Sequence, residues 1–151
     1  MKVNKVRLAI ILSGGLFLFL DQFLKWQATH AWIQPQLINP YLGWQLYLNP
    51  GVAFSLPLAN WLVIVLTIPM ILFIAFLFAR SFSKNNLFEF AAWSTVLFGA
   101  ISNLSDRIFY HHVIDYFLIA TGIINIGDAL IVAGLALFLF SLKKRAYVYQ
   151  A

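Results

Sequence analysis

Four long apolar runs constrain the fold of this chain more than any other feature. They lie at about residues 8–25, 60–79, 87–104 and 123–142. Each is close to the ~20 residues with which a helix crosses a bilayer, and a helix satisfies its backbone amides within the segment. With 62% hydrophobic and 10% charged residues, the chain falls well below the ~25% charged residues of a soluble domain. We therefore predict an all-α membrane protein of four transmembrane helices, forming one domain over residues 1–151.

Lys and Arg residues predict how these helices are oriented. Eight of the ten lie before the first run, between the second and third, and after the fourth: Lys2, Lys5, Arg7, Arg80, Lys84, Lys143, Lys144 and Arg145. The other side has only Lys25 and Arg107. Because positive charge favours the cytoplasmic side, both termini are predicted to be cytoplasmic. The basic residues flank the membrane rather than forming one face, so the net charge of +5 does not indicate a nucleic-acid-binding protein.

The first run also has the basic start and short apolar core of a signal peptide. No small-x-small cleavage site follows Leu20, and Asp21 with Lys25 continues the helical pattern. We therefore expect an uncleaved first helix. The chain has no cysteine, which excludes disulfides, thiolate metal ligands and a cysteine nucleophile.

The five acidic residues are unevenly placed. Glu89 lies at the predicted cytoplasmic start of the third run, where a negative charge suits a helix N-terminus. The other four fall near the outer membrane face: Asp21, Asp106, Asp115 and Asp128. A charge at the bilayer centre costs at least ~2.5–3.5 kcal/mol, which makes intramembrane acids functional candidates. The alternative function, a proton or ion translocator, predicts acids spread through the membrane depth instead.

Local roles are available for some of these residues. Asp21 and Lys25 are spaced i, i+4 and could form an ion pair on one helix face. "NIGD" resembles a capping box, with Asn125 as N-cap and Asp128 at the third helical position.

Asp106 and Asp115 are harder to explain locally. Asp106 closes the third apolar run, where it opposes the helix dipole and needs a partner such as Arg107. Asn103 lies one turn earlier and faces the same way. Asp115 has no cation beside it, and "HVIDYFLI" resembles a short strand over 112–119.

A second short strand is predicted within the long segment after the first run. Residues 44–49 alternate in side-chain character, and "NPG" then indicates a turn. We expect the strands at 44–49 and 112–119 to pair as a small β element on the outer surface. Its edge could bind an extended peptide by strand addition, or the element could form only a lid over the helices.

Two aspartates held close together in a partly dry site share one proton and can activate water for hydrolysis. Asp115 and Asp128 could meet in this way, because the segment between them can turn back at Gly122. A metal site built on His111, His112 and Asp115 is disfavoured, since adjacent histidines on a strand point to opposite faces. Neither a phosphate-binding glycine loop nor a G-x-S-x-G motif is present.

Five segments in order, "DQFLKW", "LNPGVAFSL", "GAISNLSDR", "VIDYF" and "NIGDALI", resemble the sequence boxes of bacterial lipoprotein signal peptidases (signal peptidase II). That family consists of aspartyl peptidases of the cytoplasmic membrane, which cut prolipoproteins before a cysteine that carries diacylglycerol. The resemblance implies lipid-modified prolipoproteins and membrane lipids as partners, and no cofactor. We expect the chain to act as a monomer.

The same resemblance implies the site residues. The catalytic aspartates are Asp115 and Asp128, and the supporting residues are Asp21, Lys25, Asn49, Gly51, Asn103, Asp106, Arg107 and Asn125. Three features depart from the family pattern. Ser102 stands where glycine is usual, Gly127 replaces an alanine, and the segment between the two catalytic aspartates is short.

Overall fold

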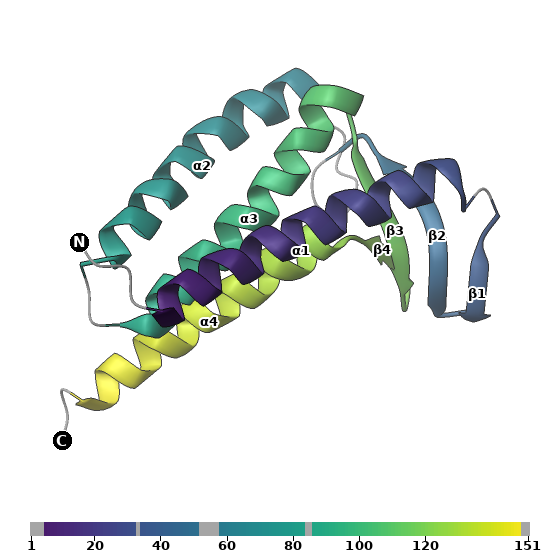
Figure 1. Cartoon of the computed structure of the whole chain (residues 1–151). Coiled ribbons are helices and arrows are strands. Elements are labelled where there is room, and N and C mark those ends of the chain that lie inside the picture. Colours follow the sequence, from purple (N-terminus) through teal and green to yellow (C-terminus); the bar gives the residue numbers. More distant parts are fainter. Residues whose placement is uncertain (1–4, 33, 52–57, 84–85, 149–151) are drawn as a thin grey trace.

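The computed structural model describes residues 5–32, 34–51, 58–83 and 86–148, with side chains as far as residue 143. Lys2, Lys84 and the side chains of Lys144 and Arg145 lie outside the described part. The elements follow one another as α1 (Lys5–His30), β1 (Gln36–Asn39), β2 (Leu42–Asn49), α2 (Asn60–Ser81), α3 (Leu87–Tyr110), β3 (Val113–Ile119), β4 (Gly122–Ile124) and α4 (Ile126–Val148). Figure 1 shows the helices as a bundle with the sheet at one end.

All four predicted helices are present, and each is long and apolar enough to cross a membrane. α2 continues through Pro69 without ending. Several helix ends differ from the limits of the predicted spans: α1 covers Lys5–His30 rather than 8–25, and α4 continues to Val148 rather than 142. α3 extends beyond residue 104 to Tyr110 and ends where His111 adopts a left-handed conformation with φ 65°. α4 begins at Ile126 rather than at 123, because residues 122–124 pair with β3 as a strand.

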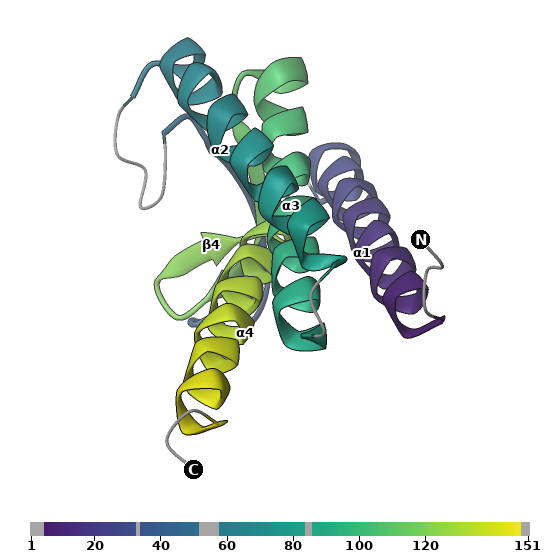
Figure 2. The same cartoon turned by 90° about the vertical axis from the view of Figure 1, so that its left-hand side faces the viewer.

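α3 is the central helix, packing most extensively on α4 and then on α2 and α1 (Figure 2). Half of its most apolar window is buried, against 11–22% for the other three helices. Glycines allow α3 and α4 to approach closely. A Cβ added to Gly99 would lie 2.4 Å from the carbonyl oxygen of Gly127, and one on Gly134 would lie 2.5 Å from Val96 Cγ2. Small residues of this kind are typical of helix contacts in membranes.

The β element is a four-stranded antiparallel sheet in the order β1-β2-β3-β4. The predicted pairing of the two strands is confirmed as β2 with β3, whereas β1 and β4 were not predicted. The register of β2 shifts between Trp44 and Tyr47, which sets Tyr47 opposite Asp115. The chain reverses at Ala120, with φ 54°, and not at Gly122, which already belongs to β4. The free edges of the sheet are therefore β1 and β4.

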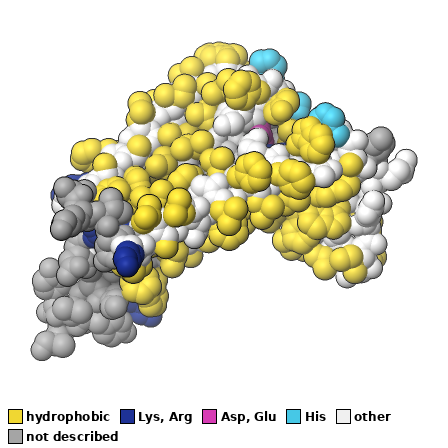
Figure 3. Space-filling model, viewed as in Figure 1, with side chains coloured by type: hydrophobic (Ala, Val, Ile, Leu, Met, Phe, Trp, Pro, Cys, Tyr) yellow, Lys and Arg dark blue, Asp and Glu magenta, His cyan; other side chains and the backbone are white. Residues whose placement is uncertain are grey.

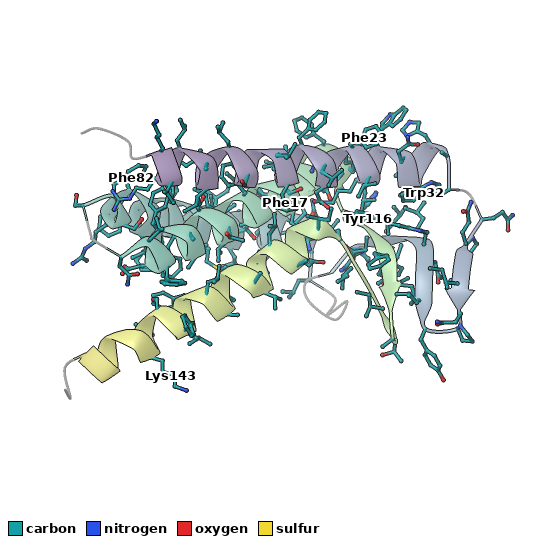
Figure 4. All side chains as sticks on the ribbon, turned by 60° about the horizontal axis from the view of Figure 1, so that its bottom comes forward. Phe17, Phe23, Trp32, Phe82, Tyr116 and Lys143 are labelled. Carbon is teal, nitrogen blue, oxygen red and sulfur yellow. The ribbon has the colours of Figure 1, made fainter. Side chains whose placement is uncertain are left out.

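Aromatic side chains hold the sheet against the end of α1. Trp44 of β2 packs on Trp32 with ring centroids 4.9 Å apart and stacks on Tyr116 of β3 at 6.2 Å. Figure 4 places Trp32 and Tyr116 together at the sheet end, and Phe82 and Lys143 at the opposite end of the bundle. The helical surface between these ends is largely hydrophobic (Figure 3). The bundle thus has a largely hydrophobic surface along its helices, with aromatic side chains at the sheet end and Lys143 towards the opposite end.

Candidate active site

Polar side chains collect inside the molecule where α1, α3, α4 and β3 meet. Asp21, Asp106 and Asp115 are 0%, 0% and 2% exposed, and Asp128 is half-buried. All four aspartates that the sequence placed near one membrane face belong to this cluster. Since unpaired buried charges are costly, the partners of each carboxylate define what the cluster can do.

Asp115 lies in the middle of β3 and is held by two amide groups. Its Oδ1 accepts a hydrogen bond from Asn125 Nδ2 at 2.6 Å, and its Oδ2 accepts one from Asn49 Nδ2 at 3.2 Å. Burial, and then the negative charge of Asp128, raise the pKa of the Asp115 carboxyl to about 7. A carboxyl with such a pKa is available both as an acid and as a base near neutral pH.

Asp128 lies in the first turn of α4, as the capping-box pattern predicts. Its backbone N–H donates to Asn125 Oδ1 at 2.8 Å, and its Oδ2 accepts from the backbone N–H of Asn125 at 3.4 Å. Asn103 Nδ2 donates to its Oδ1 at 2.8 Å. The side chain of Asn125 therefore joins the two aspartates, because it donates to the carboxylate of Asp115 and accepts from the backbone of Asp128.

Each of these three asparagines is fixed in orientation by a donor on its oxygen. Asn49 Oδ1 accepts from the N–H of Gly51 at 3.1 Å, and Asn103 Oδ1 accepts from Lys25 Nζ at 3.2 Å. Asn125 Oδ1 accepts from the Asp128 N–H, as described above. With the oxygen occupied, the amide nitrogen has to face the carboxylates. The asparagines thus present donors to both aspartates.

Lys25 is the cation of the cluster and is only 1% exposed. Its Nζ lies 2.8 Å from Asp21 Oδ2, so the ion pair that the i, i+4 spacing allows is present. It also lies 2.8 Å from Asp106 Oδ2. We expected Arg107 to be the partner of Asp106, but the side-by-side packing of α1 and α3 gives that role to Lys25.

Arg107 instead connects the cluster to the turn after β2. Its Nη2 donates to the carbonyl oxygen of Gly51, and its own carbonyl accepts from Asn60 Nδ2 at 3.1 Å. Gly51 thus contacts both Asn49 and Arg107. The hydrogen bonds run without interruption from Arg107 to Asp21, and every predicted site residue belongs to them.

Three further residues of this cluster were missed by the sequence analysis as site residues. Ser102 donates to Asp21 Oδ2 at 2.6 Å, Tyr116 donates to Asp21 Oδ1 at 2.9 Å, and Gln22 Nε2 donates to Asp106 Oδ1 at 3.0 Å. A signal existed for two of them. Ser102 departs from the family pattern, and Gln22 is a polar residue beside Asp21 within an apolar run. No such signal existed for Tyr116, because tyrosine is common in β-strands.

The described residues include no group of three His, Cys, Asp or Glu side chains that could hold a metal ion. In this cluster the ammonium group of Lys25 occupies the position between Asp21 and Asp106. An apolar cavity of about 300 Å³ adjoins Asn125 and is lined by residues of α1, the sheet and α4, among them Leu24, Trp44, Ile124 and Ala129.

Two aspartates joined by one asparagine in a buried site can share a proton and activate water, as the two carboxylates of an aspartic protease do. The comparisons with known proteins identify a family of peptidases. The model of the signal peptidase (SPase) II family, an A8-type peptidase, matches residues 6–144. Lipoprotein signal peptidases of Allorhizobium ampelinum and Bartonella tribocorum are 32% and 31% identical to the chain. These matches cover 78% and 91% of this chain, and 77% and 87% of the respective relatives.

The fold is also that of solved structures. The structure of a bacterial membrane enzyme superposes on this one with a TM-score of 0.81 at 23% sequence identity. The superposition covers 91% of this chain and 89% of the bacterial enzyme. A second structure of a bacterial membrane enzyme gives a TM-score of 0.74 at 23% identity, and the superposition covers 89% of this chain and 92% of that enzyme. With the family model matching nearly the whole sequence, the chain belongs to the signal peptidase II family of aspartic peptidases.

Proposed function

We propose that Asp115 and Asp128 are the catalytic pair of this lipoprotein signal peptidase, which cleaves the signal peptides of prolipoproteins. The observation that carries the assignment is the bridge by Asn125, whose side chain contacts Asp115 and the backbone of Asp128. Asp21 and Asp106 are less suited to catalysis. Both are fully buried, and both form an ion pair with the single ammonium group of Lys25.

The reaction needs one protonated and one ionised carboxyl in the pair. Asp115, whose pKa is raised to about 7, holds the proton and donates it to the oxygen of the scissile carbonyl. Asp128 accepts a proton from the attacking water, whose oxygen forms a bond to the carbonyl carbon. The C–N bond then breaks: the departing amine takes up the proton that Asp128 received, and a hydroxyl group of the collapsing gem-diol returns a proton to Asp115, which restores the pair.

The remaining residues of the site serve this pair in three ways. Asn49, Asn103 and Asn125 orient the two carboxylates, as their fixed amide groups allow. Lys25 forms an ion pair with both Asp21 and Asp106 and offsets one of the two negative charges that they place beside the catalytic pair. The apolar cavity next to Asn125 accepts an apolar side chain of the signal peptide.

The site lies at the sheet end of the bundle, and we place this end at the outer face of the bacterial membrane. Arg7, Arg80 and Lys143 belong to the opposite end, at the start of α1 and near the ends of α2 and α4. A cytoplasmic position for that end follows from the positive-inside rule. The diacylglyceryl chains of the substrate then remain in the outer leaflet, and the enzyme works as a monomer.

Substituting each aspartate with asparagine tests the assignment. We expect Asp115→Asn and Asp128→Asn each to lower the cleavage rate of a lipidated prolipoprotein by at least about a thousandfold, because neither variant can share a proton in the pair. The rate is measured by gel shift of the substrate after purification in detergent. Glu89→Gln is the matched control, since Glu89 lies in the first turn of α3, outside the cluster. Full turnover by either aspartate variant refutes the catalytic pair.

A further inference from the structure

Tyr116 is a buried side chain whose ring lines the apolar cavity but whose hydroxyl the mechanism above does not use. It follows Asp115 on β3 and is 1% exposed. Figure 4 shows it where the sheet meets the bundle. Its hydroxyl donates to Asp21 Oδ1 at 2.9 Å and accepts from the backbone N–H of Ile126 at 3.2 Å. A hydroxyl that is satisfied on both sides in the interior fixes whatever it joins.

The groups that it joins belong to three elements. Asp21 lies on α1, Tyr116 on β3, and Ile126 is the first residue of α4. The Ile126 N–H also donates to Asp21 Oδ1 at 2.9 Å, so these three groups contact one another pairwise. This N–H belongs to the first turn of a helix, which has no partner within the helix itself. Asp21 and Tyr116 provide that partner.

Their place in the chain connects the three groups to the catalytic pair. Tyr116 is the residue after Asp115, and Ile126 stands two residues before Asp128 in the same helical turn. Fixing Tyr116 to the start of α4 therefore fixes the strand that carries one aspartate to the turn that carries the other.

We propose that Tyr116 is a positioning residue for peptide hydrolysis: with Asp21, its hydroxyl holds the start of α4 on β3 and sets the separation of Asp115 and Asp128. The inference rests on the catalytic pair proposed above and adds a residue to it. Tyr116 has no part in proton transfer and acts through the backbone that it holds.

The separation of the pair should be visible in the pH dependence of the reaction. Burial and the charge of Asp128 keep the pKa of Asp115 high, so the protonated acid persists to about pH 7 and the rate falls above it. If the start of α4 loosens, water enters and the charges separate, so the pKa of Asp115 falls. The charged and titratable groups around Asp115 keep their identity in Tyr116→Phe, so that a shift of the limb reports their positions: Asp21 and Lys25 on α1, Tyr47 on β2, Asp106 and Arg107 on α3, and Asp128 on α4.

The first test is Tyr116→Phe in the full chain, assayed in detergent with a lipidated prolipoprotein. We expect kcat to fall about ten- to a hundredfold, as small displacements of catalytic groups do, and the alkaline limb of kcat/KM to move to lower pH. Tyr41→Phe is the matched control. Its side chain is 65% exposed at the turn between β1 and β2, so both quantities should equal those of the parent.

A second variant breaks the same contacts from the other side. Ile126→Pro removes the N–H that donates to Tyr116 and Asp21, while proline is well tolerated at the first position of a helix. We expect the same shift of the alkaline limb, and no further shift when Ile126→Pro is combined with Tyr116→Phe. Ile126→Val retains the N–H, so the alkaline limb of its kcat/KM profile should lie at the same pH as in the unsubstituted protein, even if its kcat differs.

A purely structural role makes a different prediction. Tyr116→Phe would then unfold at a lower temperature while keeping the parent's kcat and alkaline limb, and that result overturns the proposal. A failure of the catalytic pair is recognised separately, because it requires turnover by Asp115→Asn or Asp128→Asn. If the aspartate variants are inactive but Tyr116→Phe keeps the alkaline limb of its kcat/KM profile at the same pH, only the positioning role of Tyr116 is refuted.

Discussion

At the scale of single residues, the site combines two kinds of carboxylate in one buried cluster. Asp21 and Asp106 share the ammonium group of Lys25 and receive further donors from Ser102 and Gln22. Asp115 receives only amide donors among the side chains described. An ion pair favours the charged form of a carboxyl, whereas burial beside a like charge favours the neutral form. The first two aspartates therefore join α1 to α3 through Lys25, and Asp115, with its raised pKa, is a group that can exchange its proton.

This difference predicts how stability depends on pH. The pKa of Asp115 is about 7 in the folded protein and near 4 in the unfolded chain. Between these values the folded state binds more protons, so the free energy of unfolding falls as pH rises through this window. The contribution of Asp115 is on the order of 2–4 kcal/mol, present below pH 4 and lost by pH 8.

The variant Asp115→Asn cannot titrate and should show a shallower decline of stability between pH 4 and pH 8. Thermal unfolding in one detergent at several pH values measures it, with Glu89→Gln again as the control. An equally steep decline in Asp115→Asn and in the parent would contradict the pKa assigned to this carboxyl.

The sequence allowed the aspartates to be predicted but not all of their partners. The capping box of Asn125 and Asp128 and the pair of Asp21 and Lys25 depend on spacing within one helix, so both could be predicted locally. The second partner of Lys25 is Asp106, 81 positions along the chain and on another helix. Such a contact depends on the rotation and axial shift of α1 against α3, which side-chain periodicity does not determine.

At the scale of elements, long helices and short strands differ in how far they can be predicted. Each helix carries its signal over about twenty apolar residues. β1 is the exposed segment "QLIN" and β4 only "GII", and strands this short form because a neighbouring strand pairs with them. Missing β4 led directly to the wrong start of α4, since the apolar residues 123 and 124 extend the hydrophobic run of the helix.

The contact between α3 and α4 can be tested through its glycines. A Cβ on Gly134 would lie 2.5 Å from Val96 Cγ2 and 2.8 Å from the carbonyl oxygen of Ala92. Gly134→Ala should therefore force the two helices apart and destabilise the protein by about 1–3 kcal/mol, as overpacking does. Gly15→Ala is the matched control on α1, because nothing lies within 4 Å of the added methyl group. Thermal unfolding of both variants in the same detergent compares them, and equal unfolding temperatures would refute the close contact.

At the scale of the whole molecule, the bundle has a basic end and a sheet end, which Figure 1 places far apart. The start of α1, the end of α2, the start of α3 and the C-terminal part of α4 lie at the basic end. The asymmetry of Lys and Arg predicts that this end faces the cytoplasm. On this prediction the proposed catalytic pair opens at the outer face, where we expect a lipid-anchored substrate to be held by its acyl chains.

Since the chain contains no cysteine, single cysteines report this orientation without background. Ile38 of β1 is 74% exposed at the sheet end, and Ser83 is exposed directly after α2 at the other end. In intact cells with a permeabilised outer membrane, a membrane-impermeant maleimide should label Ile38→Cys. It should label Ser83→Cys only after the inner membrane is disrupted. The reverse pattern would put the sheet and Asp115 in the cytoplasm, where they could not meet a substrate anchored in the outer leaflet.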